Sequence, residues 1–156
     1  MFFRFLYLKK IKLPASLKNI SSKAFKGCTL IEEIDEIAFK NSGITKITLP
    51  DSLEAIGPEA FSECKNLKSV PLPSTLKKIG SSAFAASALK EILIPESAET
   101  GSSAFYKCGE LTKATVKNPE GMVSSYIFSY CENIEEVNLP QSLTSIGKSS
   151  FHAEKN

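Results

Sequence analysis

The side chains with the most reactive chemistry in the sequence are four cysteines and one histidine. The cysteines are Cys28, Cys64, Cys108 and Cys131, and the histidine is His152. A zinc site would need a CxxC pair or a histidine at ligand spacing, and the sequence has neither. No Asp, Ser or Cys motif is placed to use His152 as a catalytic base. We therefore expect no metal site and no catalytic site.

Glycine spacing, charge and hydropathy exclude further classes of function. Gly57, Gly80, Gly101 and Gly147 occur singly, which does not fit a phosphate-binding loop, and we expect no cofactor. The 19 basic and 17 acidic residues are spread along the whole chain and give a net charge of +2, which argues against nucleic acid as a partner. No apolar run approaches the roughly 18 residues needed to cross a bilayer, so we expect no membrane insertion.

Every cysteine lies three residues after a phenylalanine, and the phenylalanines mark a repeat. They are Phe25, Phe39, Phe61, Phe84, Phe105, Phe128 and Phe151, at spacings of 14, 22, 23, 21, 23 and 23 residues. Ser42 and Ser87 take the cysteine position in the remaining interior coils. We interpret the cysteines as small, buried, weakly hydrogen-bonding side chains that face backbone at a turn. A disulfide is conceivable only between Cys108 and Cys131, in adjacent coils about 5 Å apart, and parallel side-chain directions argue against it.

Between successive phenylalanines the sequence predicts one strand and one return segment. In the clearest coil, Ile47 and Leu49 point to one side of the strand because strand side chains alternate, and Lys46 and Thr48 point to the other. Pro50 cannot donate to a ladder and should end the strand. The Ser-Leu-x-x-Ile-Gly segment then returns across the opposite face, and the Ala-Phe step suits one helical or 3-10 turn whose ring fills the interior.

No coil can bury its apolar face alone, so the coils must stack into a solenoid. We expect about seven coils of roughly 23 residues, with a parallel sheet on one face and short strands or turns and single helical or 3-10 turns on the other. Residues 1–156 should form one domain, in which residues 1–7 can serve as an N-terminal plug and residues 152–156 are a frayed end.

The repeat pattern L-x-x-I-x-L-P-x-S-L-x-x-I-G-x-x-A-F-x-x-C resembles the BspA-like (Treponema pallidum type) leucine-rich repeat. The resemblance covers residues from about Leu8 to Phe151, and Leu67, Leu89 and Leu111 match the leucine that opens the family's strand. It implies a leucine-rich-repeat solenoid. In that family the repeats occur in bacterial surface proteins and in proteins of mucosal protists, where they are associated with adhesion to host matrix or cells.

Two stretches depart from the pattern. The coil that ends at Phe39 is only 14 residues long, and residues 33–39 replace its return segment, so we expect a pinched or missing return face there. Residues 97–101 are one residue short and lack the return-face Leu and Ile. Because both losses weaken the core, residues 96–124 should be the softest part of the stack.

Aligning the coils gives two outward rows on the strand face. The first row is Lys10, Glu33, Lys46, Ser69, Glu91, Lys113 and Glu136, whose alternating charges either stabilise the register or contact a ligand. The second row is Lys12, Asp35, Thr48, Pro71, Leu93, Thr115 and Asn138. We take the second row as the candidate binding face, because it is less regular, includes an exposed leucine and lies on the extended surface that solenoids offer to partners.

These observations leave three functional hypotheses, none of them enzymatic. The first is a module that binds a protein or extracellular-matrix ligand through the strand face, which the resemblance implies at a cell surface. The second is a cytoplasmic scaffold or assembly module, favoured by unpaired thiols and by an apolar start that Arg4 interrupts, unlike a signal peptide. The third is a fragment of a longer repeat array, whose uncapped edge also allows end-to-end self-association.

Overall fold

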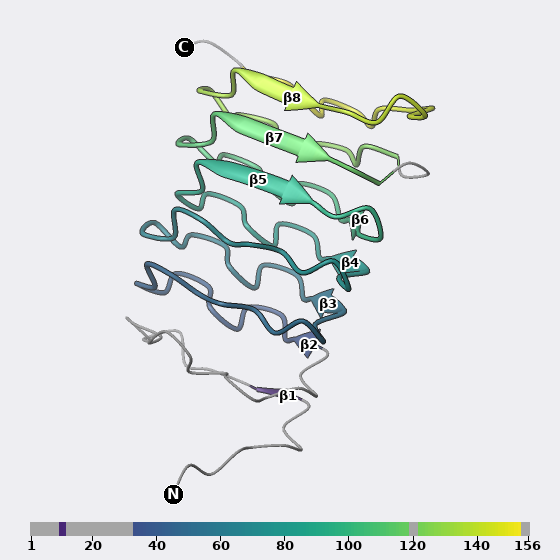
Figure 1. The fold of residues 1–156 in the computed structure, drawn as a ribbon. Coiled ribbons are helices and arrows are strands. Elements are labelled where there is room, and N and C mark those ends of the chain that lie inside the picture. Colours follow the sequence, from purple (N-terminus) through teal and green to yellow (C-terminus); the bar gives the residue numbers. More distant parts are fainter. Residues whose placement is uncertain (1–9, 12–32, 119–121, 154–156) are drawn as a thin grey trace, which may run out of the picture.

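The protein is a stack of coils that carries parallel strands on two of its faces (Figure 1). The computed structural model describes residues 10–11, 33–118 and 122–153. One sheet has the order β1-β2-β3-β4-β6 and the other the order β5-β7-β8, with every pairing parallel. The strands are β1 (Lys10–Ile11), β2 (Glu33–Ile34), β3 (Ala55–Ile56), β4 (Lys78–Ile79), β5 (Glu91–Ile94), β6 (Glu99–Thr100), β7 (Lys113–Val116) and β8 (Glu136–Asn138).

The longer strands β5, β7 and β8 form the predicted strand face, and their side chains alternate as the sequence indicates. In β5 the burial pattern is exposed, buried, exposed, buried, so Ile92 and Ile94 enter the core and Leu93 faces outward. The two-residue strands β3, β4 and β6 belong to the return segments, where Ile56 and Ile79 point inward. The leucine-rich-repeat solenoid predicted from the sequence is therefore confirmed.

A third ladder of hydrogen bonds runs through the Ala-Phe turns. The backbone N–H of Phe61 donates to the carbonyl of Ala83 at 2.7 Å, and that of Phe84 donates to Ala104 at 2.8 Å. The described residues contain no helix, so the helical or 3-10 turn expected at this step is not formed. The residues two before and two after each phenylalanine from Phe39 to Phe128 instead have positive φ, as at Glu59 (53°) and Glu63 (60°). Because of these left-handed residues, every second N–H group of the turn points toward the next coil.

The phenylalanine rings form a continuous stack inside the solenoid. The ring centroids of Phe39 and Phe61 are 4.9 Å apart and those of Phe61 and Phe84 are 5.0 Å apart, with interplanar angles of 4° and 3°. The spacing follows the distance between neighbouring strands, which is about 4.7–4.9 Å. Burial of one such ring stabilises the fold by about 1.5–3 kcal/mol. The predicted core role is confirmed for the described phenylalanines up to Phe128, whereas Phe151 is 40% exposed and Phe25 lies outside the described residues.

Gly57, Gly80 and Gly147 each follow a return-face isoleucine, and a close approach between coils requires them. A Cβ added to Gly80 would lie 2.4 Å from the backbone N of Pro58 in the preceding coil. That distance is shorter than any real Cβ contact, so a larger residue here would push the two return segments apart.

The structure corrects the alignment of the short coil. Residues Glu33 and Ile34 pair with Ala55 and Ile56, so they belong to the return-face sheet. The sequence predicted a pinched or missing return segment before Phe39, and this prediction is wrong, because Ile34 is buried in the position that Ile56 occupies one coil later. Glu33 and, through its pairing with β2, Lys10 therefore leave the predicted first outward row.

Candidate functional site

The candidate binding face is carried by three strands in register. Leu93 of β5 pairs with Thr115 of β7, and Thr115 pairs with Asn138 of β8. Leu93 is 48% exposed, although leucines elsewhere in the described coils point into the core or pack against it. Its side chain leaves the sheet on the outer surface because the neighbours Ile92 and Ile94 take the two inward positions.

Thr48 and Pro71 extend the same row into two earlier coils. Both are exposed, and the bond from Lys90 N–H to the Lys68 carbonyl, at 3.1 Å, aligns Pro71 with Leu93. These coils are not assigned as strands. At Pro71 the chain has no N–H to donate, which explains why the regular sheet begins at β5.

The two remaining members of the predicted row are not brought to this face. Asp35 follows β2 directly and stands next to the position of Gly57 in the return-face sheet, so the alignment of Asp35 with Thr48 is wrong. The spacing of 14 residues between Phe25 and Phe39 misled that alignment, as it did for Glu33. Lys12 lies outside the described residues. The face that the structure assembles is Thr48, Pro71, Leu93, Thr115 and Asn138.

Charged side chains border Leu93 in the adjacent row. Glu91, Lys113 and Glu136 occupy equivalent positions on β5, β7 and β8. The Lys113 Nζ and Glu136 Oε2 atoms are 2.8 Å apart, and Asn138 Nδ2 donates to Glu136 Oε1 at 2.7 Å. Hydrogen bonds from Lys113 and then from Asn138 lower the pKa of the Glu136 carboxyl, and the bond to Glu136 raises the pKa of Lys113. The Lys113–Glu136 pair therefore links β7 to β8, which agrees with the first of the two roles considered for this row, that of stabilising the register.

The described cysteines form a buried ladder at the turn after each phenylalanine. Cys64 Sγ donates to the Phe39 carbonyl, Cys108 to Phe84 and Cys131 to Phe105, each at 3.1 Å. All three thiols are free. The structural interpretation of these cysteines is confirmed, and Cys28 lies outside the described residues.

The environment of Cys64 and Cys131 keeps these two thiols protonated. Burial raises the pKa of Cys64, and the hydrogen bond with Cys108 followed by burial raises the pKa of Cys131, whereas the same hydrogen bond lowers the pKa of Cys108. A neutral thiol is a poor nucleophile and a poor metal ligand. Among the described residues no group of three or more His, Cys, Asp and Glu side chains could hold a metal ion.

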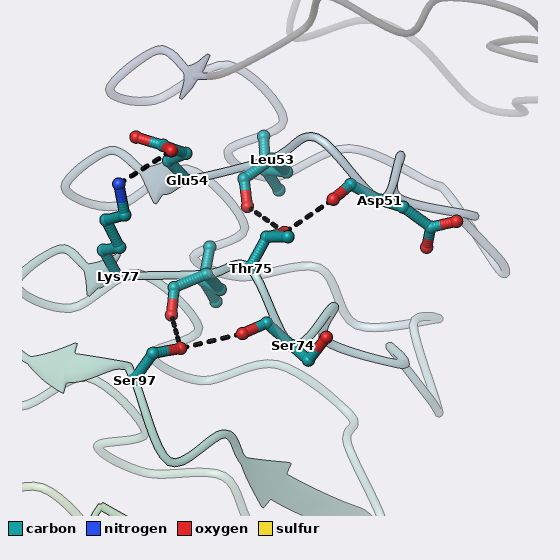
Figure 2. Close-up of polar contacts among 8 residues, drawn as sticks. Asp51, Leu53, Glu54, Ser74, Thr75, Lys77 and Ser97 are labelled. Atoms are coloured by element: carbon teal, nitrogen blue, oxygen red, sulfur yellow. Dashed lines mark hydrogen bonds and ion pairs between the residues drawn. The ribbon is translucent and has the colours of Figure 1, made fainter.

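Besides the cysteine ladder, side-chain hydroxyl groups form a ladder of hydrogen bonds that joins the return segments. The sequence analysis did not predict this hydroxyl ladder. Figure 2 shows Thr75 and Ser97, which both stand two residues after the proline that ends the strand. Thr75 Oγ1 lies 2.7 Å from the Asp51 carbonyl and 2.9 Å from the Leu53 carbonyl. Ser97 Oγ repeats the contact with Ser74 and Leu76 at 2.8 and 2.7 Å. The recurrence of Ser or Thr at this position was the available signal.

A cavity of about 280 Å³ opens between the β6 coil and the next coil. It is lined by Ala98, Glu99, Thr100, Val116, Asn118, Met122, Val123, Ser124 and Ile127. The sequence predicted a weak core in residues 96–124, because the return-face Leu and Ile are missing there. The cavity is the structural consequence of those missing side chains.

The described residues include no helix of the length and apolarity that crossing a bilayer requires. A family model described as the BspA type leucine rich repeat region, in 6 copies, matches residues 1–36 and 32–156. No curated protein matches the chain.

Solved structures share the same architecture. A leucine-rich repeat protein from Bacteroides ovatus is 32% identical over 95% of this chain and 44% of its own chain, with a TM-score of 0.71. The leucine-rich repeat protein of T. pallidum is 27% identical over 89% of this chain and 73% of its own, with a TM-score of 0.61. A leucine rich cell surface protein from Faecalibacterium prausnitzii is 20% identical over 92% of this chain and 58% of its own, with a TM-score of 0.51, and it shows the fold alone. This chain therefore spans less than half of the Bacteroides ovatus protein.

Proposed function

Because the chain belongs to the BspA-type leucine-rich repeat family, whose repeats form protein-interaction modules, we propose that it binds a protein or extracellular-matrix ligand through its strand face without catalysis. The observation that carries the proposal is the exposure of Leu93 between Pro71 and Thr115 on a sheet built by β5, β7 and β8. A cell-surface location belongs to the same proposal and follows from the repeat's association with surface proteins.

The composition of the face supports this proposal. Leu93 and Pro71 offer apolar area, and Thr48, Thr115 and Asn138 offer hydrogen-bonding groups around it. Interfaces between proteins combine an apolar centre with a polar rim in this way. Complete burial of a leucine contributes about 1.5–3 kcal/mol, so covering the exposed half of Leu93 would contribute about 1 kcal/mol.

A cytoplasmic scaffold is the second candidate, and the free thiols favour it. Cys64, Cys108 and Cys131 are unpaired, and proteins of reducing compartments keep their cysteines in this state. Burial in the turn ladder explains the same cysteines without reference to a compartment. The two candidates therefore differ mainly in location.

Location separates the candidates first. An antibody raised against residues 44–95 should label intact source cells in flow cytometry if the adhesive function holds, with permeabilised cells as the control. Labelling only after permeabilisation would overturn the adhesive reading in favour of the scaffold.

The strand face is tested with a matched pair of variants. Leu93→Asp should remove binding to immobilised matrix proteins, because it places a charge in the apolar centre of the face. Ile146→Asp is the control, because Ile146 is similarly exposed, at 53%, but stands on the return face. Equal binding by the two variants would contradict the proposed face.

A further inference from the structure

The hydrogen bonds between the phenylalanine turns all run in one direction along the stack. In each turn from Phe39 to Phe128, the N–H of the phenylalanine and those of the residues two before and two after it donate to carbonyls of the following coil. Around Phe128, the three bonds are Tyr126 to Lys148 at 2.9 Å, Phe128 to Ser150 at 2.9 Å and Tyr130 to His152 at 2.7 Å. Each of these turns therefore has a donor edge toward the C-terminal side and an acceptor edge toward the N-terminal side.

The coil of residues 132–153 has a donor edge that no described residue covers. Ser149 and Phe151 stand where Tyr126 and Phe128 stand one coil earlier, and Ser149 has the same left-handed backbone, with a φ of 51°. Neither the Ser149 N–H nor the Phe151 N–H has an acceptor in the part of the chain that the structure describes. The edge is thus already shaped to receive carbonyl oxygens, because the left-handed residue has turned these groups outward.

The same edge is an open cross-section of the apolar core. Phe151 is 40% exposed, whereas Phe128 is 1% exposed because the Phe151 coil covers it. Val137, Leu139 and Leu143 of the last coil are also only partly buried. The earlier coils show what covers an edge of this kind, since each of them is covered by a coil of the same repeat with its ring stacked on the ring before it. A coil of this repeat is therefore the occupant that fits.

Charge and strand order favour the N-terminal end of a second copy as the source of that coil. Residues 1–32 contain seven basic side chains and one acidic side chain, whereas the last coil presents the exposed carboxylates of Glu132 and Glu135. Opposite charges on two surfaces speed their encounter and set their orientation. Strand β1 is the end strand of its sheet and pairs with β2 alone, at the opposite end of the stack from β8 (Figure 1). The two ends are thus complementary in charge, and a strand with an open side lies at each.

We propose that this chain assembles head to tail, with the donor edge of residues 132–153 docked against the N-terminal end of a second copy. The direction follows from the turn ladder, because two donor edges that faced each other would leave their N–H groups without acceptors. The contact continues the stacking of coils along one axis, so it builds open chains of copies and not closed pairs. It uses a surface distinct from Leu93 and does not depend on the proposed ligand binding.

Sedimentation velocity of the full chain, from about 1 μM to about 1 mM, tests for the assembly. We expect the mean sedimentation coefficient to rise with concentration through species larger than a dimer. A monomer over the whole range would overturn the proposal, and so would a distribution that stops at the dimer, because a closed pair needs a symmetric contact.

A mixing experiment tests the direction of the contact. Phe151→Asp places a charge on the donor edge and leaves the N-terminal end unchanged, so the folded variant should be monomeric alone but should still dock on the donor edge of wild-type copies. A fluorescently labelled Phe151→Asp chain should therefore sediment with wild type, and an excess of it should shorten the wild-type assemblies. Assembly of the variant alone to the wild-type extent would contradict the docking edge, and failure to sediment with wild type would contradict the head-to-tail direction.

Two charge reversals on exposed side chains keep the test independent of the core. Glu135→Lys lies in the docking coil, and Glu96→Lys makes the same change in the middle of the stack. Glu135→Lys should weaken the assembly by about threefold, the effect of an exposed charge pair, and Glu96→Lys should leave it unchanged. Equal assembly by the two variants would overturn the assignment of the contact to the last coil.

Discussion

Replacing the repeat phenylalanine by alanine at two positions in the stack should show how much the buried rings stabilise the solenoid. Phe84 is completely buried between Phe61 and Phe105, at centroid distances of 5.0 and 5.4 Å. Phe151 is 40% exposed and contacts one ring, Phe128, at 5.9 Å. The two positions are equivalent in the repeat, so burial is the main difference between Phe84→Ala and Phe151→Ala.

The expected magnitudes follow from that difference. Phe84→Ala removes a fully buried ring and leaves a cavity, so it should lower the free energy of unfolding by about 3–5 kcal/mol. Phe151→Ala removes a ring whose buried part is about three-fifths of its surface and leaves a site open to water. Scaling the burial of a whole phenylalanine accordingly gives a loss of about 1–2 kcal/mol.

Urea unfolding followed by far-UV circular dichroism measures both losses, and hydrogen exchange locates them. Because each coil contacts only its neighbours, Phe84→Ala should accelerate exchange mainly at the amides of the Phe61 and Phe105 turns. Equal losses at the two positions would refute the reasoning, and so would faster exchange spread evenly over all coils. Either result would mean that the ring stack is not the local support of each turn.

Four further predictions concern the turns, the hydroxyl ladder, the ion pair and the thiols. Ile37→Asn should raise the free energy of unfolding in urea by about 1 kcal/mol, because Ile37 holds a φ of 54° that a β-branched residue adopts only with strain; an unchanged or lower value would contradict this. Thr75→Val should lower it by about 1 kcal/mol, whereas Thr48→Val on the strand face should change it by less than about 0.5 kcal/mol; similar effects at both sites would argue against the ladder. The pKa of Glu136 in an NMR titration should lie below its usual value and rise in Lys113→Met. A group with a lowered pKa in the folded state stabilises the fold above its unfolded-state pKa, and this contribution is lost as the pH falls through the folded-state pKa. The difference in free energy of unfolding between wild type and Lys113→Met should therefore vanish in acid. Ellman's reagent should modify Cys64, Cys108 and Cys131 only after unfolding, and rapid reaction of the native protein would show that the turn ladder opens.

The sequence predicted the parts of the fold that depend on a constant period. Spacings of 22 and 23 residues place Leu93, Thr115 and Asn138 in one row, and the strand pairing has that register. The same period places each described cysteine three residues after the phenylalanine of its own coil. Alternation within a strand then assigns each side chain to the core or the surface, so few alternatives remain.

The predictions that were wrong concern features that the repeat spacing does not determine. A spacing of 14 residues between Phe25 and Phe39 is compatible with losing either the strand or the return segment, and burial of Ile34 on the return face decides between them. The left-handed turns could not be predicted from glycine, because residues such as Glu59 and Glu63 occupy them. Hydrogen bonds to the neighbouring coil stabilise that backbone, and such bonds become evident only once the coils are stacked.

One coil carries both the exposed Leu93 and the cavity beside β6, and the physics of stacking explains why that coil tolerates them. Leu93 faces outward and Ala98 leaves the interior underfilled, yet β5 still pairs with β7 along four residues and the rings of Phe84 and Phe105 remain stacked. Different atoms form the hydrogen-bond ladders of the strand face, the phenylalanine turns and the return segments. The missing leucine side chain in one return segment therefore leaves the ladders of the strand face and the turns in place. A repeat protein can therefore lose a leucine from one segment of a coil and keep its fold, and the space that the leucine vacates remains as a cavity.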